Sequence, residues 1–209
     1  MESLHVVLVE PEIHWNTGNA GRTCLAAGAR LHLVEPLGFS LDDREVRRAG
    51  LDYWPRVRPR VWPSWESCER QLFELGEPFF FSAEARRDLW SVRYPDRVAL
   101  VFGRESAGLP LSVRKRFSDR LLAIPMLDPA LRSLNLSSSV AVALYEVLRQ
   151  REARRAAGAA AGAAAPAAER GREREAGERR PGERGADERE AGREPAREPE
   201  LAASGEPAE

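Results

Sequence analysis

The sequence predicts a single α/β domain built on a mostly parallel sheet with helices on both faces. Three observations support this prediction. Short, nearly continuous apolar runs recur up to residue 124, which is typical of strands buried on both faces of a sheet. Helical sequence separates these runs, so strands and helices alternate. Aromatic residues stop at Tyr145, so the folded part is expected to end soon after it.

Apolar runs give six predicted strands. Most are rich in Val, Leu, Ile or Phe and are followed by Gly, Pro, Ser or Glu, which favours short buried strands. The third run is weak because Arg alternates with its apolar residues. In chain order the predicted strands cover residues 4–9, 31–34, 57–61, 79–81, 98–102 and 121–124.

Four helices are expected between and after these strands. The first has Asn16 or Thr17 near its start and Gly28 at its end, because Asn and Thr favour helix N-caps and Gly favours the left-handed C-cap. With its two flanking strands it forms a β-α-β unit, which is right-handed by default. The second helix is polar and closes at Gly50. The predicted helices cover residues 19–27, 42–49, 64–75 and about 138–154.

The chain is expected to divide into a folded domain over residues 1–154 and a disordered tail over residues 155–209. From residue 151 onward the sequence is dominated by Ala, Gly, Arg, Glu and Pro, and Leu201 is its only large aliphatic residue. Such a segment cannot bury enough apolar surface to offset the entropy of ordering its chain.

The overall charge gives no indication of a nucleic-acid partner, because the 209 residues carry a net charge of −1. Any RNA binding must come from local clusters of Arg, and these clusters fit a solvated helix face and an edge strand equally well. The candidates are Arg44, Arg47, Arg48, Arg56, Arg58 and Arg60.

No metal site is expected. Cys24 and Cys68 are too few and too isolated for a disulfide framework or a zinc site, and His5, His14 and His32 share no ligand spacing. The first apolar run has no basic region before it and is too short for a secretory segment or a membrane span. We therefore expect a cytoplasmic protein.

Three polar segments carry the functional signal: residues 16–22, 102–109 and 124–141. Two of them follow predicted strands directly, and ligands bind to open α/β sheets at the carboxyl ends of the strands. They offer backbone groups, small polar side chains and, within the first loop, Glu105 as the one acid, which suits a neutral or cationic organic ligand. Neither a dinucleotide fingerprint nor a phosphate-binding P-loop is present.

Each motif alone also fits a purely structural role. Asn16 could cap a helix, and Arg22 could be a surface charge. Gly103 could end its strand, Glu105 would be favourable near a helix N-terminus, and residues 133–137 could form a turn that opens the last helix.

Taken together and in order, the three motifs resemble those of the SPOUT superfamily of S-adenosylmethionine-dependent RNA methyltransferases, over residues 4 to about 150. Further segments at residues 9–13, 35–39 and 47–53 are similar to the compact tRNA (cytidine/uridine) 2′-O-methyltransferases, which modify the wobble nucleotide. The resemblance implies a C-terminal trefoil knot, an exception to the rule that chains do not thread loops.

The resemblance also implies a chemistry and a set of site residues. S-adenosyl-L-methionine would donate a methyl group to the ribose 2′-hydroxyl of the wobble nucleotide, cytidine or modified uridine, in the tRNA anticodon stem-loop, without a metal. Each site of a homodimer would be completed by the partner's Arg. The residues matching those around the hydroxyl are Asn16, Arg22, Glu105 and Asn135, and those matching the donor pocket are Phe81, Gly103, Ile124 and Ser133.

Arg22 is expected to bind the phosphate or the developing alkoxide, because a guanidinium with a pKa above about 12 is a poor proton acceptor. The chain departs from the family pattern at His14 and Trp15, where a Pro-containing pair is usual, and in residues 127–132, which are one residue longer. The alternatives are a 2′-O-methyltransferase of ribosomal or other RNA, a noncatalytic RNA-binding protein of the same fold, and a small-molecule methyltransferase.

Overall fold

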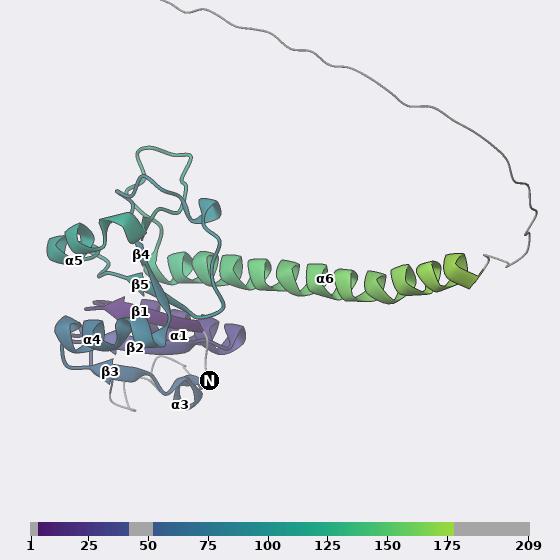
Figure 1. Cartoon of the computed structure of the whole chain (residues 1–209). Coiled ribbons are helices and arrows are strands. Elements are labelled where there is room, and N and C mark those ends of the chain that lie inside the picture. Colours follow the sequence, from purple (N-terminus) through teal and green to yellow (C-terminus); the bar gives the residue numbers. More distant parts are fainter. Residues whose placement is uncertain (1–3, 42–51, 178–209) are drawn as a thin grey trace, which may run out of the picture. The chain divides into compact units, whose positions relative to one another are not determined.

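The computed structural model describes residues 4–41 and 52–177 and divides into two units, Met1–Ala163 and Ala164–Glu209. The first unit holds a six-stranded sheet (Figure 1) whose strand pairs are all parallel. Its strand order is β3-β2-β1-β5-β4-β6. The strands are β1 Leu4–Val9, β2 Arg30–Val34, β3 Arg60–Trp62, β4 Glu77–Phe81, β5 Val98–Phe102 and β6 Leu121–Leu122.

Helices cover both faces of this sheet, as the sequence predicts. Successive residues of a strand point to opposite faces, so Leu4, Val6 and Leu8 join one core cluster while Val7 and Val9 join the other. The first cluster includes residues of α1, α3 and α6, and the second includes residues of α4 and α5. These helices are α1 His14–Ala27, α3 Trp54–Val57, α4 Trp65–Leu75, α5 Leu111–Arg116 and α6 Leu136–Gly177, with short 3₁₀ turns at Leu89–Ser91 and Ser118–Arg120.

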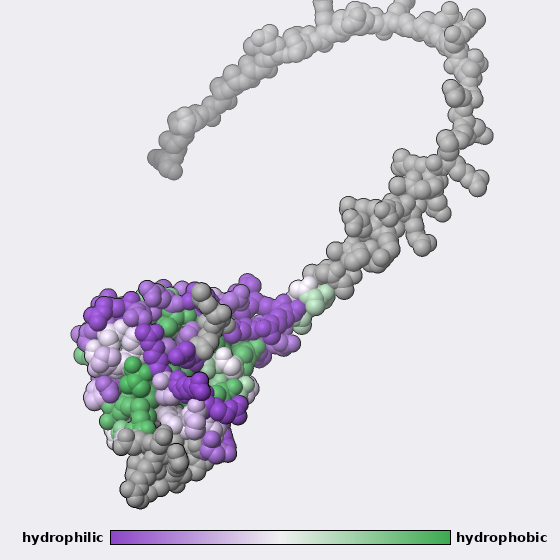
Figure 2. Space-filling model, turned by 90° about the horizontal axis from the view of Figure 1, so that it is seen from below, coloured by the Kyte–Doolittle hydropathy of each residue, from purple (hydrophilic) through white to green (hydrophobic). Residues whose placement is uncertain are grey.

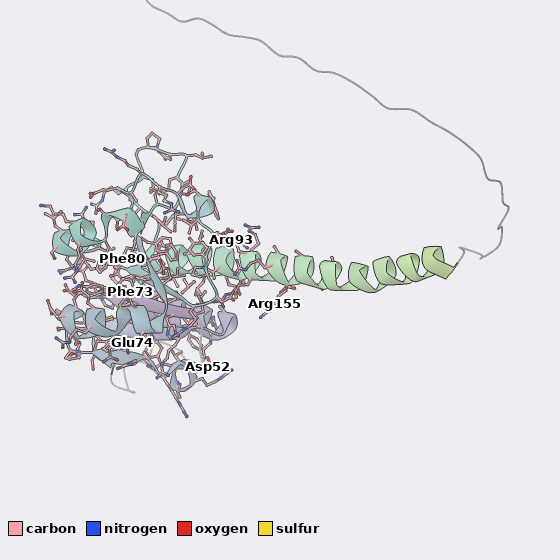
Figure 3. All side chains as sticks on the ribbon, viewed as in Figure 1. Asp52, Phe73, Glu74, Phe80, Arg93 and Arg155 are labelled. Atoms are coloured by element: carbon pink, nitrogen blue, oxygen red, sulfur yellow. The ribbon has the colours of Figure 1, made fainter. Side chains whose placement is uncertain are left out.

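The aromatic residues of the core lie deep in the first unit, and most of its charged residues lie at the surface. Phe80 is fully buried and stacks on Phe117 at a centroid distance of 4.3 Å. Figure 3 shows Phe80 inside the body and Arg93 at its surface. The face drawn in Figure 2 is largely hydrophilic, with smaller apolar areas. Among the described residues, no helix has the length and apolar character needed to cross a membrane.

The predicted strand over residues 57–61 is wrong in its first half. Trp54–Val57 is instead a one-turn helix with Pro at its start, a position that proline favours, and the strand begins at Arg60. This turn places Trp54 and Val57 against α1 at Gly21, where an added Cβ would lie 3.0 Å from the Trp54 ring. The final predicted strand is also shorter than expected and ends at Leu122.

The first helix begins at His14, five residues earlier than predicted, so Asn16 and Thr17 lie in its first turn and are buried. Ile13 occupies the N-cap position and makes no side-chain capping bond, because the cap comes from another loop, as shown below. The predicted end is confirmed, since Gly28 adopts the left-handed conformation with φ of 65°.

The last helix continues to Gly177, so the end predicted at Arg154 came too early. Ala, Arg and Glu dominate this stretch and have high helix propensity, which can extend a helix without any buried face. The boundary at residue 154 and the disorder of residues 155–209 stay predictions, and residues 178–209 lie outside the described part. The predicted helix over residues 42–49, with Arg44, Arg47 and Arg48, also lies outside it.

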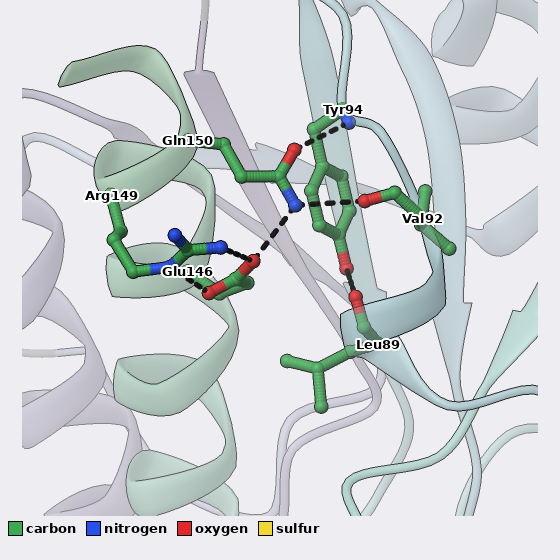
Figure 4. A network of polar contacts seen from close by, with 6 residues as sticks. All are labelled: Leu89, Val92, Tyr94, Glu146, Arg149 and Gln150. Atoms are coloured by element: carbon green, nitrogen blue, oxygen red, sulfur yellow. Dashed lines mark hydrogen bonds and ion pairs between the residues drawn. The ribbon is translucent and has the colours of Figure 1, made fainter. Parts of the chain in front are cut away.

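A buried polar network fixes α6 to the segment that precedes β5 (Figure 4). The Gln150 side chain accepts a hydrogen bond from the Tyr94 N–H at 3.0 Å and donates to the Val92 carbonyl and to Glu146, both at 2.8 Å. Hydrogen bonds from Arg149 hold the pKa of Glu146 below its ordinary value. The part of α6 around Glu146 and Gln150 is therefore anchored to the segment between β4 and β5.

A second buried network joins three strands of the sheet. Trp62 Nε1 donates to His32 Nδ1 at 3.1 Å, so the neutral His32 ring carries its proton on Nε2 and donates it to His5 Nδ1 at 3.0 Å. A second proton on His32 would displace the Trp62 donor. Burial above all, with His5, Arg30 and Arg60 adding repulsion, lowers the pKa of His32 to about 3.

This network predicts an acid-sensitive fold. The pKa of a His side chain in an unfolded chain is about 6.5, so above this pH His32 is neutral in both the folded and the unfolded state. Between pH 6.5 and 3, His32 is protonated in the unfolded state but stays neutral in the folded state. The free energy of unfolding should therefore fall by about 1.4 kcal/mol per pH unit from this residue as pH drops from 6.5 towards 3. Urea unfolding at pH 7, 6, 5 and 4 measures this. The free energy of unfolding should fall less steeply with decreasing pH for His32→Gln than for the unchanged chain. Exposed His14, changed to Gln, is the control, and equal slopes for all three proteins would contradict the assignment.

Candidate active site

A cavity of about 490 Å³ lies at the carboxyl ends of β4, β5 and β6. Loops far apart in the sequence form its wall, because parallel strands end at one edge of the sheet. Its lining includes the end of β4, the loop after β5, the loop before α6 and the start of α1. The residues concerned include Ile13, Asn16, Phe81, Gly103, Glu105, Ser106, Ile124, Arg132, Ser133 and Asn135.

The loop after β5 is a tight turn that requires glycine at two points. The Gly108 N–H donates to the Arg104 carbonyl at 2.8 Å, and the Arg104 N–H donates to the Gly108 carbonyl at 3.2 Å. Gly108 has a φ of 68°, a backbone conformation that residues other than glycine rarely adopt. A Cβ on Gly103 would lie 2.1 Å from the Gly108 carbonyl carbon, so only glycine lets the two backbone segments meet.

One part of the cavity is apolar and flat. The Phe81 ring stacks on the Phe102 ring with a centroid distance of 4.6 Å and an interplanar angle of 10°. Ile124 packs against the same core cluster, and Phe81 and Ile124 both line the cavity. This arrangement suits a flat organic group held between apolar side chains and backbone polar groups.

The polar part is a chain of hydrogen bonds between three predicted site residues. Asn16 Nδ2 donates to Glu105 Oε1 at 2.9 Å, and Asn135 Nδ2 donates to Asn16 Oδ1 at 2.8 Å. Asn135 Oδ1 in turn accepts from the Ser137 N–H and hydroxyl at 2.9 and 2.7 Å. The two amide side chains are thus fixed in orientation, with their oxygen and nitrogen assignments set by this network.

Two carboxylates connect the loop before α1 with the loop after β5. Glu105 accepts hydrogen bonds from the Glu12 and Ile13 N–H groups at 2.8 and 3.3 Å and so caps α1 from another part of the chain. Glu12 in return accepts from the Ser106 N–H at 2.9 Å and the Ser106 hydroxyl at 2.7 Å, which holds the pKa of Glu12 below its ordinary value. Glu10 pairs with Arg104 beside them.

The Glu105 oxygens already accept three hydrogen bonds, so this carboxylate holds Asn16 and the start of α1 in place. Replacing it with Gln puts an NH₂ group where an acceptor is needed, which leaves a donor of the α1 terminus unpaired at a cost of about 1–3 kcal/mol. We expect Glu105→Gln to lower thermal stability and to impair turnover through misplacement of Asn16. Melting and initial-rate measurements check this. Glu84→Gln is the matched control, since Glu84 lines the same cavity with a largely exposed carboxylate.

Seven of the eight predicted site residues line the cavity together: Asn16, Phe81, Gly103, Glu105, Ile124, Ser133 and Asn135. Arg22 does not. It is exposed on α1, where its guanidinium lies 4.7 Å from the centre of the Tyr53 ring, whose hydroxyl donates to the Gly18 carbonyl at 3.1 Å. Within one chain Arg22 is thus held apart from the other predicted catalytic residues.

Sequence reasoning missed Glu12, Ser106 and Arg132. The Arg132 guanidinium lines the cavity and donates to the Ser106 carbonyl at 3.4 Å. Glu12 stands in the segment that carries the family resemblance, but the contact between residues 94 positions apart has no local signal. In the part of the chain that the structure describes, no three His, Cys, Asp or Glu residues gather to hold a metal ion.

Comparison with known proteins agrees with this geometry. The model of the SpoU rRNA Methylase family matches residues 3–145. A tRNA (cytidine(34)-2′-O)-methyltransferase of Acidovorax sp. is 45% identical over 148 residues, covering 70% of this chain and 91% of the relative. A solved structure described as giving insights into the 2-OH methylation of C/U34 on tRNA is 45% identical with a TM-score of 0.67, covering 72% of this chain and 97% of the other.

An AdoMet-bound rRNA methyltransferase from Sinorhizobium meliloti is also similar, at 26% identity with a TM-score of 0.57 over 71% of this chain and 57% of the other. The predicted superfamily is therefore confirmed by its sequence and structural relatives. The first unit has a parallel sheet with a cavity at its strand ends, and the family match spans this sheet and its loops. The chain therefore belongs to the SpoU rRNA Methylase family.

Proposed function

We propose that this protein transfers a methyl group from S-adenosyl-L-methionine to the ribose 2′-hydroxyl of nucleotide 34, the wobble nucleotide of tRNA. The observation that carries the proposal is the cavity that the three motif loops build together, in a chain 45% identical to a tRNA (cytidine(34)-2′-O)-methyltransferase over 91% of that relative. The acceptor is cytidine or a modified uridine, in keeping with the C/U34 of the structural relative.

The cavity fits the methyl donor in shape and chemistry. The close approach at Gly103 leaves a backbone cradle, and the stacked Phe81 and Phe102 rings supply an apolar wall beside it. Phe81, Gly103, Ile124 and Ser133 would hold the donor's adenosine and methionine parts, largely through backbone groups. The bound donor would supply an electrophilic methyl group attached to a sulfonium. Because the sulfur leaves as a neutral thioether, the transfer needs no metal.

The chain's own residues supply orientation. Asn16 and Asn135 are fixed on two sides by Glu105 and Ser137, so they can hydrogen-bond an entering ribose without first reorganising. The loops that carry them are joined by the Glu12 and Glu105 carboxylates. As the O–CH₃ bond forms and the S–CH₃ bond breaks, the hydroxyl proton passes to water, and a cation close to the oxygen eases this loss.

That cation is Arg22 of a second subunit in our proposal. Arg22 is exposed and lies outside the cavity of its own chain, which supports a site completed across a homodimer. Arg56 and Arg58 are exposed and available to the RNA, while the Arg60 guanidinium lies 3.7 Å from the centre of the Trp62 ring.

The trefoil knot and a cytoplasmic location are further parts of the proposal, supported by the family. A crystallographic trace of residues 77–150 tests the knot.

Incubation of the purified protein with a methyl-labelled donor and either bulk tRNA or ribosomal RNA tests the function. We expect label in tRNA, retained as a 2′-O-methylated dinucleotide at the wobble position after nuclease digestion. Label in ribosomal RNA alone would favour the alternative acceptor. Binding of donor and tRNA without transfer would favour a noncatalytic RNA-binding protein.

A further inference from the structure

An exposed aromatic group stands next to the cavity and has no part in the mechanism above. The first turn of α1 places His14 and Trp15 between two cavity-lining residues, Ile13 and Asn16. Trp15 is 51% exposed, and its ring centre lies 4.6 Å from that of His14, which lies 6.4 Å from Phe39. We call His14, Trp15 and Phe39 the aromatic ledge.

The backbone that carries the ledge is held in place on two sides. The Gly38 N–H donates to the Pro11 carbonyl at 3.0 Å, and a Cβ on Gly38 would lie 2.5 Å from the Glu12 carbonyl oxygen, so the Phe39 loop is fixed against the start of α1. Glu105 fixes the same helix start from the other side. An exposed tryptophan on a preformed support loses little further freedom when a planar partner stacks on it.

Charge decides which part of an RNA fits the ledge. Glu12 and Glu105 in the adjoining segments disfavour a phosphate there, whereas Glu10 is paired with Arg104. The neutral face of a base can stack on an aromatic ring whatever its sequence. Trp15 directly precedes the cavity-lining Asn16 in the first turn of α1, so a nucleotide next to the reacting one can reach the ledge. Unpaired bases are the parts of RNA that proteins bind by stacking.

We propose that the aromatic ledge, and Trp15 above all, stacks an unpaired base that flanks the nucleotide held in the cavity. This inference rests on the proposed function for its choice of RNA. It makes Trp15 a binding residue that sets which loop sequences and loop shapes are accepted.

The test combines a protein variant with a base deletion. Trp15→Ala should weaken binding of a wobble-containing anticodon stem-loop by about 5- to 150-fold, the range of lost base–aromatic stacking, and Trp15→Phe should retain most of the affinity. Trp90→Ala is the matched control, because Trp90 is 54% exposed elsewhere on the first unit. Stem-loops with one abasic nucleotide on either side of the wobble position then identify the stacked base. For that RNA, Trp15→Ala should cause no further loss.

Three outcomes would overturn the inference. The first is a Trp15→Ala variant that binds the stem-loop as tightly as the unchanged protein. The second is an equal loss of affinity on Trp15→Ala substitution for every abasic stem-loop. Loss of RNA binding together with a change of oligomeric state in sedimentation would show that the ledge contacts another protein subunit instead. Donor binding by calorimetry should stay unchanged and shows that the variant is folded. Failure of the unchanged protein to methylate any tRNA would count against the proposed function, a result separate from these.

Discussion

Arg22→Ala should reduce the rate of methyl transfer by about 10²- to 10³-fold while leaving donor binding intact, because the variant removes a cation that stabilises charge developing on the ribose oxygen. Donor affinity is expected to be retained because Arg22 lies outside the cavity of its own chain and, in the partner's site, is proposed to contact the ribose oxygen or phosphate of the RNA and not the donor. Single-turnover rates and donor titration by calorimetry measure the two effects separately. Loss of donor binding in parallel with turnover would contradict this role.

Arg22→Lys separates charge from shape. Lysine keeps the positive charge but lacks the planar fork that binds a phosphate or an alkoxide through two N–H groups. We expect this variant to remain well below the unchanged enzyme in turnover. Near-normal turnover would show that a point charge suffices.

Mixed dimers test whether Arg22 acts on the partner's site. Arg22→Ala and Asn135→Ala subunits are co-expressed with different tags. In each heterodimer one site then has both Asn135 from one chain and Arg22 from the other, and the second site lacks both. Random assembly should then restore about one quarter of normal activity, because half of the dimers carry one intact site of two. Isolated heterodimers without activity would place Arg22 and Asn135 in the same chain's site, contrary to our proposal.

The sequence predicted well wherever a local pattern determined the structure. Strands β1, β2 and β5 are buried on both faces and lie within one residue of their expected positions, because continuous Val and Leu runs have few alternatives in a parallel sheet. Gly28 ended its helix as expected. Seven predicted site residues line one cavity, because the loops that carry them meet at one edge of the sheet.

Other features depended on contacts that no local pattern contains. The start of α1 was placed too late because its cap comes from Glu105, 91 positions after His14, rather than from a side chain at its own N-cap. The turn at Trp54 is set by packing against Gly21 on another helix. The hydrogen bonds between Glu12 and Ser106 and the placement of Arg22 over Tyr53 likewise arise only when the chain is folded.

Gly103→Ala is expected to have the largest effect on the donor site. The added methyl group would lie 2.1 Å from backbone atoms of Gly108 and Leu109, and backbone cannot move aside as the end of a flexible side chain can. We expect a loss of about 3 kcal/mol, the upper range for overpacking, and hence a melting temperature lower by about 6–12 °C. The turn would open, and donor binding by calorimetry should disappear even at temperatures where the variant remains folded.

The matched control is Gly158→Ala, the same chemical change at a site where the added Cβ meets nothing within 4 Å. Gly158 lies inside α6, where alanine is favoured over glycine by about 1 kcal/mol, so this variant should be neutral or slightly more stable and should bind the donor normally. Opposite signs for the same substitution would tie the effect to the approach of Gly103 to Gly108. Normal donor affinity in Gly103→Ala would instead mean that this turn does not form the donor's cradle, and the assignment of the cavity to the donor would fail with it.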